Sequence, residues 1–273
     1  MFRSAFVVFH VVFHIVLSVL FLSVGMQAQW KNVTNPKLPR TADGKPNLNA
    51  PTPRSADDKP DLSGIWWVPD GSVEGIDAPP KYSLNLAADL NPDDLGMRPW
   101  VMELMKQRQA NMRKDMPPSR CLPWPVPAMV TEPVPFQIIQ TAESIILLHE
   151  QMSMFRQIFL DGRVLSDHPN PTWLGYSKGR WEGDTLVVET RGFNDLSWLD
   201  GVGHPHTEDL HVTEKFRRKD FGHMEIQFTI DDPKAYATAW TGTLPVELTA
   251  PDTQLYEDVC QENEKDSAHL VGK

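Results

Sequence analysis

The sequence predicts a mainly β protein, built as a single antiparallel β-barrel with one amphipathic helix and long proline-rich connections. Downstream of residue 135, apolar and polar side chains alternate, as in Met224, Ile226, Phe228 and Ile230, which is the pattern of strands with one wet face. Turn signals such as Asp220-Phe-Gly222 separate the segments, and no helical spacing intervenes. Because a long meander has exposed edges, we expect it to close into a barrel.

The elements are expected in the following order. A first strand, 62–68, lies between two prolines. A helix over 99–115 follows from the helical spacing of Val101, Leu104, Met105 and Met112, with Pro99 placed to start it. The remaining strands are expected at 136–140, 144–150, 154–161, 173–181, 185–191, 209–218, 223–230, 235–247 and 253–260.

The N-terminal segment predicts export. Residues 1–28 contain a long apolar run after Arg3, which indicates either a cleaved signal peptide or a retained N-terminal anchor. Residues 29–60 are rich in proline and predict an extended tether, and residues 61–273 are expected to form the barrel domain. The expected location is therefore the periplasm or the exterior, with membrane contact only through an uncleaved N-terminus.

Two global features limit the partners and the covalent structure. The 26 Lys and Arg against 36 Asp and Glu give a net charge of -10, which repels nucleic acid, so nucleic acid is not an expected partner. Cys121 and Cys260 are the two cysteines, and an oxidising compartment favours a disulfide between them. Two buried free thiols or one reactive cysteine are the alternatives.

Several phrases of the sequence resemble known groups. Gly64-Ile-Trp66 resembles the Gly-x-Trp with which calycins, the lipocalin-like barrels, begin. Longer phrases, including Arg120-Cys-Leu-Pro123, Gly179-Arg-Trp-Glu-Gly-Asp184 and Gly203-His-Pro-His206, are similar to those of uncharacterised secreted proteins common in soil acidobacteria. This resemblance implies export and a shared fold, and it brings no assigned reaction.

Polar residues are concentrated between 194 and 214, in a segment that includes a long loop. The candidate catalytic residues are His204, His206, His211, Asp195 and Glu208. A metal-assisted mechanism would use His204, His206 and His211 as ligands of a divalent metal, the one cofactor that the sequence suggests. A metal-free mechanism would use a histidine oriented by a carboxylate for acid/base chemistry. The remaining alternative is a surface loop whose polar side chains cap turns.

The aromatic residues suggest a binding site. The candidate ligand-binding residues are Trp66, Trp173, Trp181, Trp198, Asn194 and His149. Ser177 fits Gly-x-Ser-x-Gly, but the strand-to-helix context of a nucleophile elbow is missing, so we interpret it as a strand residue. The leading hypothesis is an exported barrel that binds a small apolar, aromatic or sugar-like ligand. The alternatives are a periplasmic enzyme and a structural envelope protein.

Overall fold

The computed structural model describes residues 38–69, 81–166 and 169–260, so the predicted signal segment lies outside the described residues. The chain divides into two compact units, Met1–Asn47 with Ala250–Asp252, and Leu48–Thr249 with Thr253–Lys273. The barrel belongs to the second unit. None of the helices in the described ranges has the length and apolar character needed to cross a membrane.

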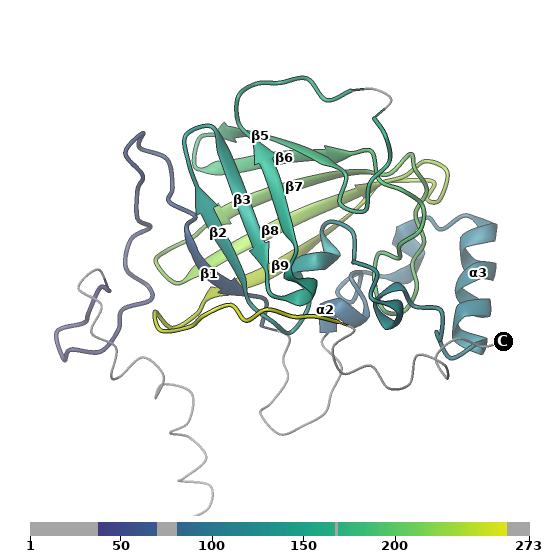
Figure 1. Cartoon of the computed structure of the whole chain (residues 1–273), viewed down its shortest axis with the longest axis horizontal. Coiled ribbons are helices and arrows are strands. Elements are labelled where there is room, and N and C mark those ends of the chain that lie inside the picture. Colours follow the sequence, from purple (N-terminus) through teal and green to yellow (C-terminus); the bar gives the residue numbers. More distant parts are fainter. Residues whose placement is uncertain (1–37, 70–80, 167–168, 261–273) are drawn as a thin grey trace, which may run out of the picture. The chain divides into compact units, whose positions relative to one another are not determined.

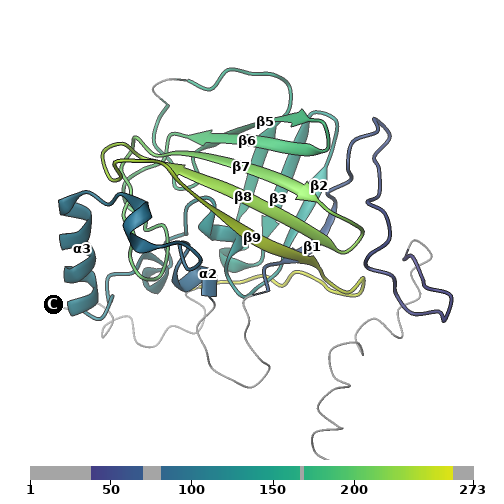
Figure 2. The ribbon, with the colours of Figure 1, turned by 180° about the vertical axis from the view of Figure 1, so that it is seen from behind.

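The fold is a closed barrel of nine strands, which confirms the predicted fold class (Figures 1 and 2). Strands adjacent in sequence are adjacent in the barrel, and β1 pairs with β9 to close it. The strands are β1 (Gly64–Trp67), β2 (Phe136–Gln140), β3 (Ser144–His149), β4 (Phe155–Phe159), β5 (Tyr176–Glu182), β6 (Thr185–Arg191), β7 (His211–Arg218), β8 (His223–Asp231) and β9 (Trp240–Leu248).

One pair of strands departs from the predicted antiparallel pattern. Strand direction cannot alternate all the way round a closed ring of nine strands, so one neighbouring pair must be parallel. That pair is β4 and β5, with Ile158 opposite Ser177. The connection 160–175 therefore returns from one end of the barrel to the other, as a parallel pair requires.

Two predicted elements differ in the structure. Residues 253–260 are not a strand, because pairing of β1 with β9 leaves the sheet no edge to extend. The expected helix forms as α3 (Pro99–Ala110) and ends early, because Met112 has a φ of 53°. Val101 is the one fully buried residue of α3. The buried face of this helix is therefore smaller than the helical spacing of the apolar residues predicts. Short helices α2 (Lys81–Leu84), η1 (Pro92–Leu95), η2 (Pro117–Arg120), η3 (Ala128–Val130) and η4 (Gln151–Ser153) complete the fold.

The end of the barrel at which β7 meets β8 is closed by a tryptophan and an arginine. Trp66 is fully buried and its indole N–H donates to the Leu62 carbonyl over 2.9 Å. The Arg218 guanidinium lies 4.9 Å above the Trp66 ring and donates to the carbonyls of Asp61, Asp220 and Phe221. Burial lowers the pKa of Arg218 to about 10. These contacts fill that end with side chains.

A buried ion pair crosses the barrel interior. Arg156 of β4 donates to Glu214 of β7, with 3.1 Å between Nη1 and Oε1, and both side chains are almost completely buried. The same guanidinium donates to Ser177 of β5 and to Thr190 of β6. Four strands are therefore joined through one side chain. Ser177 is a buried strand residue, in agreement with its interpretation from the sequence.

The predicted disulfide is present between Cys121 and Cys260, which are 139 residues apart. Cys121 directly follows η2 in the proline-rich segment after α3, and the bond connects this segment to the C-terminal part of the chain. In the chain-entropy model, closing so long a loop stabilises a fold by on the order of 4–5 kcal/mol.

Part of the predicted tether packs against the barrel. Residues 53–60 form a tight turn in which both Ser55 N–H and Ser55 O–H donate to the Lys59 carbonyl. Arg54 forms a two-pronged ion pair with Asp184 in the β5–β6 turn, at 2.8 and 2.7 Å. Residues 53–60 are therefore held against the β5–β6 turn.

The buried ion pair gives a stability prediction. We expect Arg156→Met to lower the free energy of unfolding by about 3–5 kcal/mol, because it leaves Glu214 buried without its partner. The double variant Arg156→Met/Glu214→Leu should recover most of that loss. Urea unfolding monitored by circular dichroism measures both values. As a control, Arg180→Ala removes an exposed pair and should cost at most about 1 kcal/mol. Equal effects of the two single variants would contradict the prediction.

Candidate functional site

The longer connections leave from one end of the barrel, which we call the loop end. Strands β3, β6 and β8 finish there, and β7 and β9 begin there. The β6–β7 loop (192–210), the β8–β9 loop (232–239) and the helical connection between β1 and β2 are all attached to this end. Figures 1 and 2 show α2 and α3 on the same side as these loops.

The β6–β7 loop is folded around one carboxylate. Asp200 is fully buried and accepts hydrogen bonds from the backbone N–H groups of Leu86, Gly203 and His204. It also contacts Nδ1 of His204 at 2.6 Å. Gly203 has a φ of 98°, which only glycine adopts easily, and this allows the chain to turn back toward Asp200. Asp200 therefore fixes both the loop and the orientation of the His204 ring.

A second histidine of the same loop, His206, is paired with a serine. Nε2 of His206 is 2.7 Å from the Ser197 hydroxyl, and Nδ1 is 3.2 Å from the Thr207 carbonyl. Both His206 and Ser197 are buried. Burial lowers the pKa of His206. A neutral imidazole that donates from Nδ1 accepts at Nε2, which is the arrangement of a base beside a serine nucleophile.

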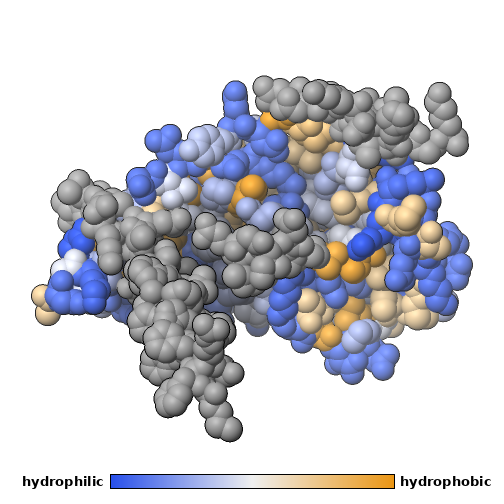
Figure 3. Space-filling view, turned by 90° about the horizontal axis from the view of Figure 1, so that it is seen from below, coloured by the Kyte–Doolittle hydropathy of each residue, from blue (hydrophilic) through white to orange (hydrophobic). Residues whose placement is uncertain are grey.

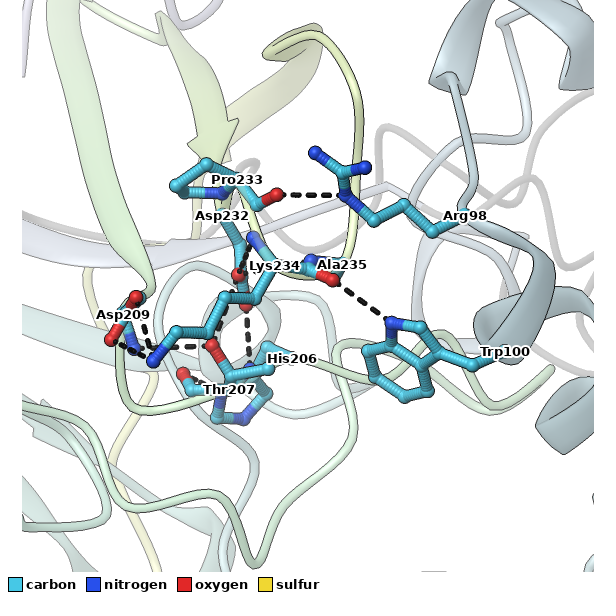
Figure 4. Close-up of polar contacts among 9 residues, drawn as sticks. All are labelled: Arg98, Trp100, His206, Thr207, Asp209, Asp232, Pro233, Lys234 and Ala235. Carbon is cyan, nitrogen blue, oxygen red and sulfur yellow. Dashed lines mark hydrogen bonds and ion pairs between the residues drawn. The ribbon is translucent and has the colours of Figure 1, made fainter.

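The β8–β9 loop fixes the position of this histidine (Figure 4). Asp232 accepts from the N–H and the hydroxyl of Thr207, at 2.6 and 3.0 Å. Lys234 forms an ion pair with Asp209 in the β6–β7 loop. On the other side, Arg98 and Trp100 donate to the carbonyls of Pro233 and Lys234, which ties the start of α3 to the same loop.

Helix α3 also contacts the β6–β7 loop directly. Arg108 donates to the Gly203 carbonyl at 2.6 Å, and its guanidinium lies 4.1 Å from the centre of the Trp198 ring. Burial lowers the pKa of Arg108 to about 10. Trp100 and Met102 of α3 are exposed. Figure 3 shows separate hydrophobic patches among hydrophilic surface in the half of the molecule that holds α3.

Trp240, at the start of β9, is the centre of an aromatic cluster. Its ring centre lies 5.9 Å from Phe228, 5.8 Å from Tyr236 and 6.3 Å from His204. Trp240 is 3% exposed, and its indole Nε1 has no hydrogen-bond partner among the described residues. Tyr236 is bonded, because its hydroxyl donates to the Pro205 carbonyl. The unpaired indole N–H is therefore a buried donor in an apolar setting.

His149, at the end of β3, also has a buried ring nitrogen that lacks a hydrogen-bond partner among the described residues. Its ring stacks on Phe136 with centres 5.6 Å apart, and it is 5% exposed. Burial, with a smaller effect of the Arg156 charge, lowers the pKa of His149 to about 3, so the ring is neutral. Its Nε2 has no partner among the described residues.

The structure separates the predicted catalytic residues. His204 and His206 lie in the buried loop, whereas His211 is on β7, where Val212 and Glu214 face inward and His211 consequently faces outward. Asp195 and Glu208 are exposed and do not orient the histidines; Asp200 and Thr207 do so instead. Within the described residues, no group of three His, Cys, Asp or Glu side chains could hold a metal ion. Within the loop, Nδ1 of His204 contacts Asp200, and both ring nitrogens of His206 contact protein groups.

The predicted ligand-binding residues are also dispersed. Trp66 is at the end opposite the loops, where its indole is bonded to Leu62. Trp181 is partly buried against the core, and Trp173 precedes β5. Asn194 is used locally, since its side chain accepts from the Leu196 N–H. Of this set, Trp198 and His149 lie at the loop end.

Sequence reasoning missed several residues of the site. Asp200 and Ser197 pair with His204 and His206 of the same loop, whereas Tyr236 and Trp240 contact this loop from the β8–β9 loop and β9. The sequence holds one signal for Asp200, because it lies four residues before His204 and could contact its ring. The sequence does not show that Asp200 is buried while Asp195 is exposed. Arg156 and Glu214 lack any such signal, because they lie on different strands.

Comparison with known proteins adds no family assignment. No family model matches this chain, and no curated protein or solved structure matches it either.

The buried histidines predict a pH dependence of stability. His149 and His206 have lowered pKa values in the folded chain, so the unfolded chain, with histidine pKa values near 6.5, binds more protons below that pH. We expect the free energy of unfolding to fall as the pH decreases from 6.5 toward 4, by up to about 1.4 kcal/mol per pH unit from His149, with His206 adding to the fall. Urea unfolding at several pH values measures the slope. His149→Phe should reduce it, and an unchanged slope in that variant would contradict the prediction.

Proposed function

We propose that this protein is an exported β-barrel that binds a small, neutral, largely aromatic molecule at the loop end. The observation that carries the proposal is Nε2 of His149, which is buried beside the interior network of Arg156 and has no partner in the part of the chain that the structure describes. Buried polar atoms in folded proteins almost always have a partner, supplied by protein, water or ligand. A bound molecule with one hydrogen-bonding group would satisfy this nitrogen.

The charge balance of the interior supports a neutral ligand. Arg156 is paired with Glu214 and held by two hydroxyl groups, so the network has no net charge to offer. The neutral His149 ring adds hydrogen bonding without charge. Aromatic rings at the same end, including Trp240 and Phe228, favour a flat apolar ligand.

Export supports a role outside the cytoplasm. The disulfide between Cys121 and Cys260 is typical of proteins that fold in an oxidising compartment. The apolar N-terminal run would direct the chain there, with the periplasm or the exterior as destination. The resemblance to calycins and to secreted acidobacterial proteins is in keeping with such a barrel.

Binding of N-phenyl-1-naphthylamine tests the proposed function. This neutral aromatic probe carries one N–H group and becomes fluorescent in apolar sites. We expect saturable binding to the oxidised protein, weakened roughly tenfold by His149→Phe, which keeps a ring but removes the nitrogen. His223→Ala, at the opposite end of the barrel, should bind as the wild type does. Absence of saturable binding, or equal affinity in His149→Phe, would refute the proposal.

A second candidate function is acyl transfer by the Ser197 and His206 pair. The 2.7 Å contact places the hydroxyl beside an imidazole that can take its proton. The burial of Ser197 favours a structural pair, so the candidate requires the loop to open. If the serine is a nucleophile, a fluorophosphonate reagent should label Ser197, detected by peptide mass spectrometry, and His206→Gln should abolish labelling. Reaction at other serines alone would exclude this function.

A further inference from the structure

One nitrogen of His204 is fixed in its role. Nδ1 contacts Asp200 Oδ2 at 2.6 Å, and the same carboxylate also accepts three backbone N–H groups. A carboxylate accepts hydrogen bonds only, so Nδ1 must carry the proton. In the neutral ring, Nε2 is then the acceptor. Asp200 thus presents an acceptor nitrogen at a fixed position in the buried loop.

A ring that carries a hydrogen-bond donor lies near the His204 ring. The Trp240 ring is centred 6.3 Å from the His204 ring, with the planes inclined by 49°. Its Nε1 is a donor only, is buried, and has no partner among the described residues. The two side chains come from different elements, the β6–β7 loop and the start of β9. They make a neighbouring acceptor and donor at the loop end.

We propose that Nε2 of His204 and Nε1 of Trp240 together bind one hydroxyl group of the ligand, which makes the ligand a phenol or another aromatic alcohol. This inference rests on the proposed function and specifies its ligand class. The ligand O–H donates to His204, and its oxygen accepts from the Trp240 N–H. A carbonyl or ether could accept from Trp240 but could not donate to His204.

The surroundings fit an aromatic body for this ligand. Phe228 and Tyr236 pack edge-on against Trp240, at 84° and 75°, and Tyr236 has its hydroxyl already bonded to Pro205. The remaining ring surface is apolar, so it contributes contact area without competing for the ligand hydroxyl. Selectivity for the hydroxyl therefore depends on His204 and Trp240.

A pair of ligands that differ only in the hydroxyl tests the inference. Affinities of 2-naphthol and naphthalene are measured for the oxidised protein by equilibrium dialysis. His204→Asn keeps an N–H group for Asp200 and removes the Nε2 acceptor. Trp240→Phe keeps a ring and removes the donor. Naphthalene affinity serves in each variant as the check that the site is still folded.

Matched controls exist elsewhere in the chain. His223→Asn changes another histidine whose Nδ1 contacts a carboxylate, that of Asp220 at 2.7 Å, at the opposite end of the barrel. Trp181→Phe changes a tryptophan of β5 beside the β5–β6 turn, at the end of the barrel opposite the proposed site. Both controls should behave as the wild type does.

The expected result is a roughly tenfold preference of the wild-type protein for 2-naphthol, lost in His204→Asn and in Trp240→Phe while naphthalene affinity stays the same. A preference that survives both substitutions overturns the inference. Equal binding of the two ligands by the wild-type protein also overturns it but leaves the proposed function intact. Failure of both ligands to bind overturns the inference and the proposed function together.

Discussion

Pairing of β1 with β9 is the constraint on which the rest of the structure depends. It joins strands far apart in the chain through Trp66 opposite Leu248 and Trp67 opposite Glu247. Gly64, at the start of β1, has a φ of 146°, a backbone conformation that residues with a side chain rarely adopt, so glycine is favoured there. Closure removes the exposed edges of the sheet and, with nine strands, forces the parallel β4–β5 pair. The direction of every strand, and so the placement of the loops, follows from it.

The two ends of the barrel differ in the length of the connections between strands. At the opposite end the β2–β3, β5–β6 and β7–β8 connections are short, and Arg218 and Trp66 fill the space. At the loop end, long connections must satisfy their backbone groups without sheet pairing. Asp200 and Asp232 do this by accepting several N–H groups each. These two buried carboxylates thus hold the irregular loops in a fixed conformation over this end of the barrel.

The polar groups of the interior differ in how completely they are satisfied. Arg156 has four hydrogen bonds, which explains how a charged pair is retained in the core. His149 and Trp240 each have a buried nitrogen that no other described residue contacts by a hydrogen bond. Stability alone does not favour such groups, since apolar residues of similar size would avoid the desolvation cost. Their location at the loop end is the reason for connecting them with ligand binding.

The sequence by itself determined the class of fold, most strand positions and the disulfide. Alternation along β8 and turn residues such as Gly222 are local properties, and two cysteines leave one pairing. Tertiary structure decided the rest. Whether His211 faces outward, whether Glu214 meets Arg156 and whether the Leu86 N–H meets Asp200 all depend on contacts between distant segments. Spacing along the chain carries no information about these contacts, because burial and partnership arise only when the barrel closes.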